Sequence, residues 1–252
     1  MGRIMQLKLV FLFIMLSSTS YSQVEKDTLK VLFVGNSYTY FENLTQIVSI
    51  ISDSTKTKLI TKKSTVGGVS LRQHWLGLKG LKTKEKIKKG NFDIVVIQGH
   101  SMSTIKMPDS ISKYAKLFCD YIKTNNAKPY LYQTWAREKV PQFQEAITRV
   151  YEDISINNNV SLVPVGEAWK LAKQLRPEIK LFSPDGSHPS RQGTFLTACV
   201  FIGSILREIP ENLPSRIYTK DIDGELLFLA RMDPLDVAFF KRIAKEFIPK
   251  NE

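Results

Sequence analysis

A serine that follows a short apolar segment is the first candidate for chemistry in this sequence. Residues 31–34 are Val-Leu-Phe-Val, and Gly35, Asn36 and Ser37 come directly after them. A short apolar run rich in β-branched and aromatic residues is typical of a buried parallel strand. Ligands bind at the carboxyl ends of the strands in such sheets. Ser37 is therefore either a nucleophile at that edge or only the cap of the following helix.

A histidine with an aspartate three residues before it is the second candidate. A serine hydroxyl is a weak nucleophile unless a base takes its proton, and of the three histidines only His188 has an aspartate, Asp185, at this spacing. That carboxylate could fix the imidazole tautomer and stabilise the imidazolium. With eleven aspartates in 252 residues, such a pair arises by chance in about one sequence in eight. The surrounding Gly/Pro-bounded loop and the strand-end serine favour the catalytic interpretation.

The elements that must position these residues alternate between strand and helix patterns. This alternation predicts an α/β fold, a three-layer α/β/α sandwich around a mostly parallel sheet of about five strands. We find no internal repeat and no internal linker. The expected strands are residues 29–34, 58–65, 91–97, 129–134 and 160–165, and the expected helices are 42–54, 71–78, 108–126, 141–156, 167–175, 192–208 and 234–247.

The N-terminal segment has the pattern of a signal peptide. Arg3 and Lys8 precede an apolar stretch of residues 9–16, and small residues follow, up to Ser22. The apolar stretch is too short to span a bilayer. We therefore expect a signal peptide at residues 1–22 and a single domain at 23–252, exported to the periplasm or outside the cell after cleavage near Ser22. An uncleaved membrane anchor is the alternative.

The charge and the cysteines limit the partners. The net charge is +12 and becomes +10 without residues 1–22, and many of the lysines lie between residues 56 and 89. This segment either forms a solvated surface or attracts a partner, which would be an anionic polysaccharide or a membrane surface. No nucleic-acid motif is present, and we expect no integral span in the mature chain. Cys119 and Cys199 are expected in the core, with a disulfide between them left open; the oligomeric state is unknown.

Four blocks of the sequence together resemble the SGNH (GDSL-type) hydrolase superfamily. The segment from Gly35 to Thr39 resembles the first block of that superfamily, and the segment from Asp185 to Pro189 resembles its last block. Gly67-Gly68 and Gln98-Gly99 occupy the places of the second and third blocks. The order of the blocks and their places at strand ends match over residues 29–208. The resemblance implies a flavodoxin-like three-layer fold and ester hydrolysis through an acyl-enzyme.

The resemblance also implies roles for individual residues. Ser37, His188 and Asp185 would form the catalytic triad. The oxyanion hole would consist of the backbone N–H groups of Ser37 and Gly68, with Gly67 as the alternative glycine, and the side chain of Gln98.

Two departures from the superfamily pattern affect this assignment. Asn36 stands where aspartate is usual. The third block reads Gln98-Gly99-His100-Ser101 and lacks the Gly-x-Asn-Asp pattern. It resembles the Gln-Gly-Glu block of carbohydrate acetylesterase branches, and a Gln amide can donate to an oxyanion as an Asn amide does.

The remaining polar and aromatic residues are candidates for substrate contacts or for the core. Candidate substrate contacts are Asn36, Gly67, His100 and Trp135; for Trp135, stacking on a sugar and burial in the core are both open. His74 is expected on a helix surface or in packing. Asp185 and His188 lack a third ligand at a suggestive spacing, so we expect no metal and no cofactor.

The sequence thus predicts an exported serine esterase. Its expected substrate is a small-molecule or glycan ester with a small acyl group, such as an O-acetyl group on carbohydrate. One alternative is a glycan O-acyltransferase that uses the same triad. The other is a non-catalytic glycan-binding relative.

Overall fold

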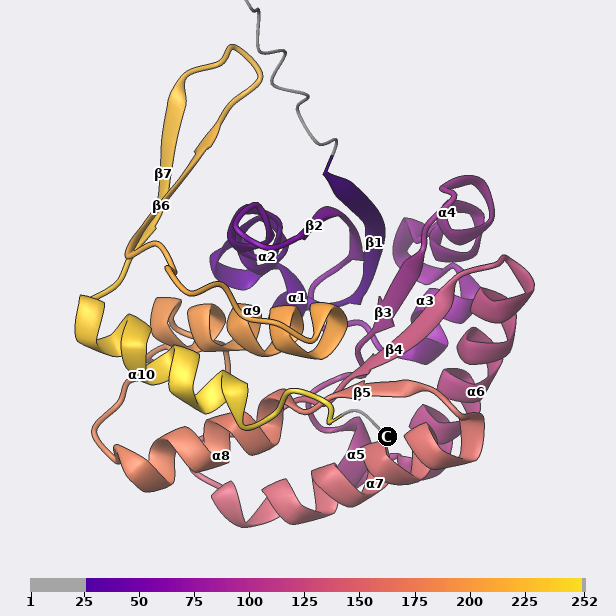
Figure 1. Ribbon diagram of the computed structural model, residues 1–252. Helices are drawn as coiled ribbons and strands as arrows, with labels where there is room; N and C mark the ends of the chain where they lie inside the picture. Colours follow the sequence, from indigo (N-terminus) through magenta and orange to yellow (C-terminus); the bar gives the residue numbers. More distant parts are fainter. Residues whose placement is uncertain (1–25, 251–252) are drawn as a thin grey trace, which may run out of the picture.

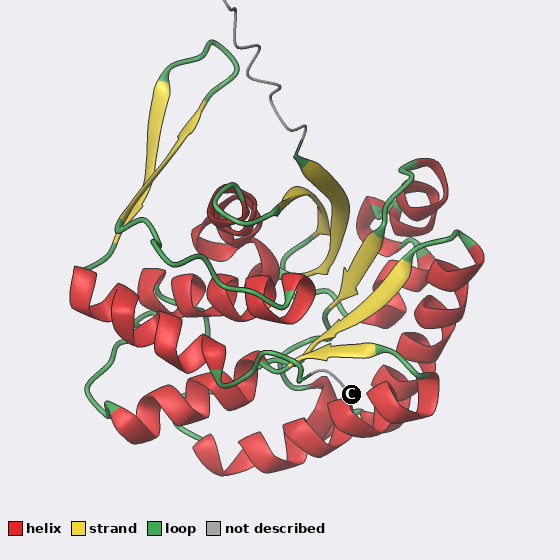
Figure 2. Ribbon diagram, viewed as in Figure 1, coloured by secondary structure: helices red, strands yellow, loops and turns green. Residues whose placement is uncertain are grey.

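The central sheet has five parallel strands. The computed structural model describes residues 26–250. The sheet has the order β2-β1-β3-β4-β5, which confirms the expected α/β sandwich (Figures 1 and 2). Because every strand is parallel, the loops after all the strands meet at one edge. The strands are β1 (Asp27–Gly35), β2 (Thr57–Thr65), β3 (Ile94–Ile97), β4 (Lys128–Tyr132) and β5 (Ser161–Val163).

Helices cover both faces of this sheet and bury a separate apolar core on each. Along β1, Val31 and Phe33 contribute to one core and Leu32 and Val34 to the other, as the alternation of a strand requires. The first core includes side chains of α2 (Leu44–Ser52), α8 (Val165–Leu175), α9 (Arg191–Leu206) and α10 (Pro234–Lys245). The second includes side chains of α3 (Leu71–Leu76), α4 (Thr83–Lys89), α6 (Pro108–Thr124) and α7 (Gln144–Asn158).

The two cysteines lie in different cores and are free thiols. Cys199 belongs to the first core and Cys119 to the second, so the sheet separates them. Burial raises the pKa of the Cys119 thiol to about 12 and also raises the pKa of Cys199. The expected burial of both residues is confirmed, and the open question of a disulfide is answered: they do not pair.

Some elements differ from those expected. The last strand of the sheet ends at Val163, because Pro164 lacks the N–H that a strand would use and α8 begins directly after it. Two short helices were not expected, α1 (Ser37–Tyr40) and α5 (Ser103–Lys106). A hairpin of β6 (Arg216–Lys220) and β7 (Leu226–Arg231) was also missed; it extends away from the sandwich in Figure 1.

The expected signal peptide, residues 1–22, lies outside the described residues. Within residues 26–250, no helix combines the length and the apolar character needed to cross a membrane.

Candidate functional site

Ser37 lies in a tight turn at the carboxyl end of β1. Asn36, not Ser37, is the N-cap of α1, and its side-chain oxygen accepts a hydrogen bond from the Tyr38 amide at 3.1 Å. The Asn36 side-chain nitrogen donates to the Val69 carbonyl at 3.0 Å, which ties this turn to the loop after β2. An aspartate could not donate that second bond, which gives a physical reason for the asparagine. The interpretation of Ser37 as the helix cap is therefore wrong.

Gln98 lies beneath this turn. Its side-chain oxygen accepts hydrogen bonds from the Asn36 amide at 3.0 Å and from the Thr39 hydroxyl at 2.9 Å, and its nitrogen donates to the Gly99 carbonyl. Gly35 is needed here because a Cβ atom on it would come within 2.5 Å of the Gln98 side-chain oxygen. Gln98 is 1% exposed. Its expected role as an oxyanion donor does not fit this geometry, because the amide is used to hold the turn.

The structure brings the three expected triad residues together. The Nε2 atom of His188 lies 2.9 Å from the Ser37 Oγ, and its Nδ1 atom lies 2.5 Å from an Asp185 carboxylate oxygen. The other Asp185 oxygen accepts hydrogen bonds from the Ser187 and His188 amides, each at 2.9 Å. Burial raises the pKa of Asp185, but the bonds from His188 and the two amides outweigh it and lower the pKa to about 2. Asp185 is therefore ionised at neutral pH.

Trp135 holds the loop that carries Asp185 and His188. Its indole N–H donates to the Ser187 carbonyl at 2.9 Å, and its ring is stacked between those of Tyr38 at 4.6 Å and Trp169 at 3.9 Å. Trp135 is 1% exposed, and both of its faces are covered. This arrangement corrects the idea that Trp135 stacks on a sugar; the core interpretation fits.

His188 itself is fixed by two aromatic rings. The ring of Phe41 stacks on the imidazole at 4.4 Å, and the ring of Tyr38 meets it edge-on at 5.7 Å. These two contacts restrict the rotation of the imidazole, so its two nitrogens keep their alignment with Asp185 and Ser37.

A cavity of about 380 Å³ opens at Ser37 and His188. Of the candidate substrate contacts, Asn36, Gly67 and His100 line it and Trp135 does not. Gly68, expected in the oxyanion hole, also lines it. Two other members of the lining, Ser101 after β3 and Arg137 after β4, lie at strand ends as the sequence indicates, but the sequence analysis gave them no role. The complete lining is Asn36, Ser37, Tyr38, Tyr40, Phe41, Gly67, Gly68, His100, Ser101, Arg137, Ser187 and His188.

The third histidine, His74, lies outside this cavity. It is buried on α3, and its ring nitrogens lie 2.9 Å from the Gly35 carbonyl and 2.7 Å from the Thr83 hydroxyl. Burial lowers its pKa. His74 thus supports the end of β1 from within the fold, which confirms the packing interpretation.

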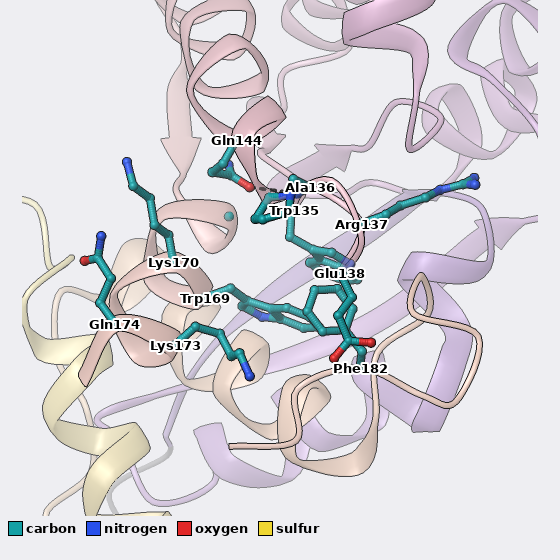
Figure 3. A pocket seen from close by; sticks show the side chains of 12 residues that line it. Trp135, Ala136, Arg137, Glu138, Gln144, Trp169, Lys170, Lys173, Gln174 and Phe182 are labelled. Carbon is teal, nitrogen blue, oxygen red and sulfur yellow. Dashed lines mark hydrogen bonds between the residues drawn. The ribbon is translucent and has the colours of Figure 1, made fainter. Parts of the chain in front are cut away.

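A second cavity, of about 400 Å³, lies beside the first and is lined partly by Trp169 and Phe182 (Figure 3). Lys170, Lys173 and Gln174 of α8 form one of its sides. The two cavities share only one lining residue, Arg137. None of the triad residues lines the second cavity.

Metal-ligating side chains do not gather at the site. Among residues 26–250, no group of three or more His, Cys, Asp or Glu residues is arranged to hold an ion.

Comparisons with solved structures identify the fold. A Bacteroides uniformis protein of the DUF4886 family superposes with a TM-score of 0.68 at 16% identity, over 87% of this chain and 94% of that one. A candidate SGNH hydrolase from Slackia heliotrinireducens gives a TM-score of 0.59 at 19% identity, over 69% of this chain and 97% of that one. An acetyl xylan esterase gives a TM-score of 0.51 at 16% identity, over 69% of this chain and 98% of that one. No protein-family model and no curated protein matches the sequence.

These likenesses define the class of fold. The five-stranded parallel sheet between helix layers is the SGNH hydrolase fold. At such low identities a common fold does not establish a common activity, so function must be argued from the site.

Proposed function

We propose that this protein is a serine esterase of SGNH type that acts through Ser37, His188 and Asp185. One observation carries the proposal: a continuous chain of hydrogen bonds leads from the Asp185 carboxylate through His188 to the Ser37 hydroxyl, at the edge of a cavity. This is the arrangement of nucleophile, base and orienting group that acyl transfer requires.

In the proposed reaction, Nε2 of His188 takes the Ser37 proton as the serine oxygen attacks the ester carbonyl. The collapse of the tetrahedral intermediate releases the alcohol, which receives that proton, and leaves an acyl group on Ser37. Water then attacks the acyl-enzyme with His188 again as base, which releases the acid and restores the serine. Asp185 stabilises the imidazolium in both halves of the reaction.

Backbone amides at the cavity are suited to hold the oxyanion. Ser37 is the first residue of α1, where an amide has no partner within the helix. Gly68 has a φ of +67°, which lets the loop after β2 turn at the cavity. Neither amide donates a hydrogen bond within residues 26–250. We assign both N–H groups to the oxyanion hole.

We assign the third oxyanion donor to His100 in place of Gln98. The Met102 amide donates to the Nδ1 atom of His100 at 3.3 Å, which requires Nδ1 to be unprotonated and leaves the proton on Nε2. Burial, together with Arg137 and Lys106, lowers the pKa of His100, so the ring is neutral near pH 7. His100 lines the cavity at Ser37, and its Nε2–H has no partner within residues 26–250.

Replacing His100 tests this assignment. His100→Phe keeps a ring but removes the donor, and we expect it to lower kcat about 10²-fold with little change in KM. His100→Asn restores an N–H donor and should recover part of the loss. The measurement is steady-state hydrolysis of an aryl acetate. An unchanged kcat in His100→Phe would remove His100 from the oxyanion hole.

The proposed class of substrate rests on fewer observations than the proposed mechanism does. We favour small acyl esters, including O-acetyl groups on carbohydrate; one protein of similar fold is an acetyl xylan esterase. Transfer of the acyl group to a glycan hydroxyl would use the same triad, with the glycan in place of water. Export of the protein stays a prediction from residues 1–22.

A fluorophosphonate probe tests the serine mechanism directly. We expect one equivalent of label, located on Ser37 by peptide mass spectrometry, because among the serines of residues 26–250 only Ser37 has an imidazole nitrogen at its hydroxyl. Two serines in the same cavity are internal controls: the Ser187 hydroxyl bonds to Tyr38 at 2.8 Å and the Ser101 hydroxyl bonds to Arg137 at 3.2 Å. Folded protein without label, or with label on either control, would contradict the proposal.

A further inference from the structure

We propose that the ester hydrolysed at Ser37 carries an anionic group and that Arg137 binds it. The inference rests on the proposed esterase function and extends it to a class of substrate. The shared chemistry is that of a carboxylate, sulfate or phosphate on the alcohol portion of the ester, and an O-acylated acidic sugar is the carbohydrate that would supply it.

The fold fixes the position of Arg137. The amide of the residue before it, Ala136, donates to the buried side chain of Gln144 at 2.7 Å. The amide of the residue after it, Glu138, donates to the carbonyl of Gly186 at 2.9 Å, in the loop that carries Asp185 and His188. The backbone of Arg137 is therefore anchored both to α7 and to the triad loop.

The side chain of Arg137 reaches the triad cavity. In Figure 3 it extends away from the cavity that Trp169 lines. Its guanidinium donates to the Ser101 hydroxyl at 3.2 Å, on the loop after β3, and it lines the same cavity as Ser37 and His188. An anion on a substrate seated at Ser37 would thus meet this guanidinium.

The residues that line this cavity carry one permanent charge, and the ionised carboxylate of Asp185 is bonded to His188 instead of lining it. Arg137 is the one cation with a permanent charge in the lining, and the lining contains no aspartate or glutamate. Within residues 26–250, no carboxylate lies within 4.0 Å of the Arg137 guanidinium. Arg149, Arg176 and Arg191, by contrast, each pair with a carboxylate.

The chemistry of a guanidinium then suggests the ligand. It presents five N–H donors in a planar fork that matches the two oxygens of a carboxylate, and the Ser101 bond uses only one of them. The field of Lys106 adds to that of Arg137 at the neighbouring His100. The positive charge of the whole chain, +12, would also speed the approach of an anion.

A matched pair of substrates tests the inference. 4-Acetoxybenzoate and 4-acetoxybenzamide have the same acetyl ester and nearly the same shape, and they differ in one negative charge; the 3-substituted pair changes the direction of that charge. We expect kcat/KM, measured as acetate release, to be at least tenfold higher for the anion in one of the two pairs. Added salt should reduce the ratio.

Variants locate the effect. Arg137→Gln should bring the ratio of anion to amide close to one, and Arg137→Lys, which keeps the charge but not the fork, should give an intermediate ratio. Arg149→Gln, on the outer surface of α7, is the control and should leave the ratio unchanged. A wild-type ratio near one in both pairs, or a ratio that survives Arg137→Gln, would overturn the proposal.

A binding measurement separates this inference from the esterase function. Calorimetric titration of Ser37→Ala protein with the two acetoxybenzoates and their amides does not depend on turnover. Anion-selective binding that is lost on Arg137→Gln would support the anion site even if no acetate were released by the wild type. Absence of selective binding would overturn it even if neutral esters were hydrolysed.

Discussion

Ser37→Ala is expected to lower kcat for ester hydrolysis by about 10⁶-fold with little change in KM. The variant removes the atom that forms the acyl-enzyme, while the cavity and the amides of Ser37 and Gly68 remain. What activity remains would come from water attacking an ester polarised by those amides. Acetate release from an aryl acetate, followed over long times with stopped aliquots, measures both the wild-type rate and the residual rate of the variant.

The triad should also behave as one unit. Because His188 acts through Ser37, the double variant Ser37→Ala/His188→Ala should be no slower than either single variant. Ser112→Ala is the control, since that serine lies half-buried on α6 outside the cavity, and its hydroxyl donates to the Pro108 carbonyl at 2.9 Å. Independent, additive losses from Ser37 and His188 would contradict the shared mechanism.

The close approach of Ser37, His188 and Asp185 could be predicted because its signal lies in the order of the chain. Ser37 follows an uninterrupted apolar strand, and parallel strands must end at a common edge. Asp185 and His188 are three residues apart, so one turn of loop brings the two side chains together. Such short-range and edge-of-sheet relations depend little on how the rest of the molecule packs.

The roles of Gln98 and Trp135 could not be predicted in the same way. Both follow strands at the correct edge, but each side chain turns inward, and only the packed fold shows what it meets. Gln98 satisfies the buried Asn36 amide, and Trp135 fills the space between Tyr38 and Trp169. A buried polar group must be hydrogen-bonded, so Gln98 supports the turn that carries Ser37.

The role proposed for Arg137 and the hairpin of β6 and β7 were not predicted, for related reasons. An arginine in a loop is common and predicts nothing by itself. The role proposed for Arg137 depends on a cavity lining that has no carboxylate, and segments far apart in the sequence form that lining. The hairpin strands carry charged and apolar residues with little alternation, and most of their side chains are exposed or half-buried. Without a buried face, a strand leaves a weak pattern in the sequence.

Asp185→Asn is expected to lower kcat about 10⁴-fold while the protein stays folded. In the wild type, the Asp185 carboxylate holds the proton of His188 on Nδ1, which leaves Nε2 free to accept the Ser37 proton. An asparagine amide can donate to Nδ1, which would place the proton on Nε2 and disable the base. Asp153→Asn, an exposed position on α7, is the matched control. A kcat within tenfold of the wild type would contradict this role of Asp185.

The pH dependence of the same variant gives a second measurement. The pKa of Asp185, about 2, lies below the value near 3.9 expected in the unfolded chain. The stabilisation that this carboxylate supplies is therefore complete above about pH 4 and is lost as the pH falls toward 2. Thermal unfolding of the wild type should show this acid-dependent loss, and Asp185→Asn should show less of it. Because Asp185 stays ionised above pH 4, any loss of wild-type kcat on acidification that is already complete above pH 4 must report a group other than Asp185.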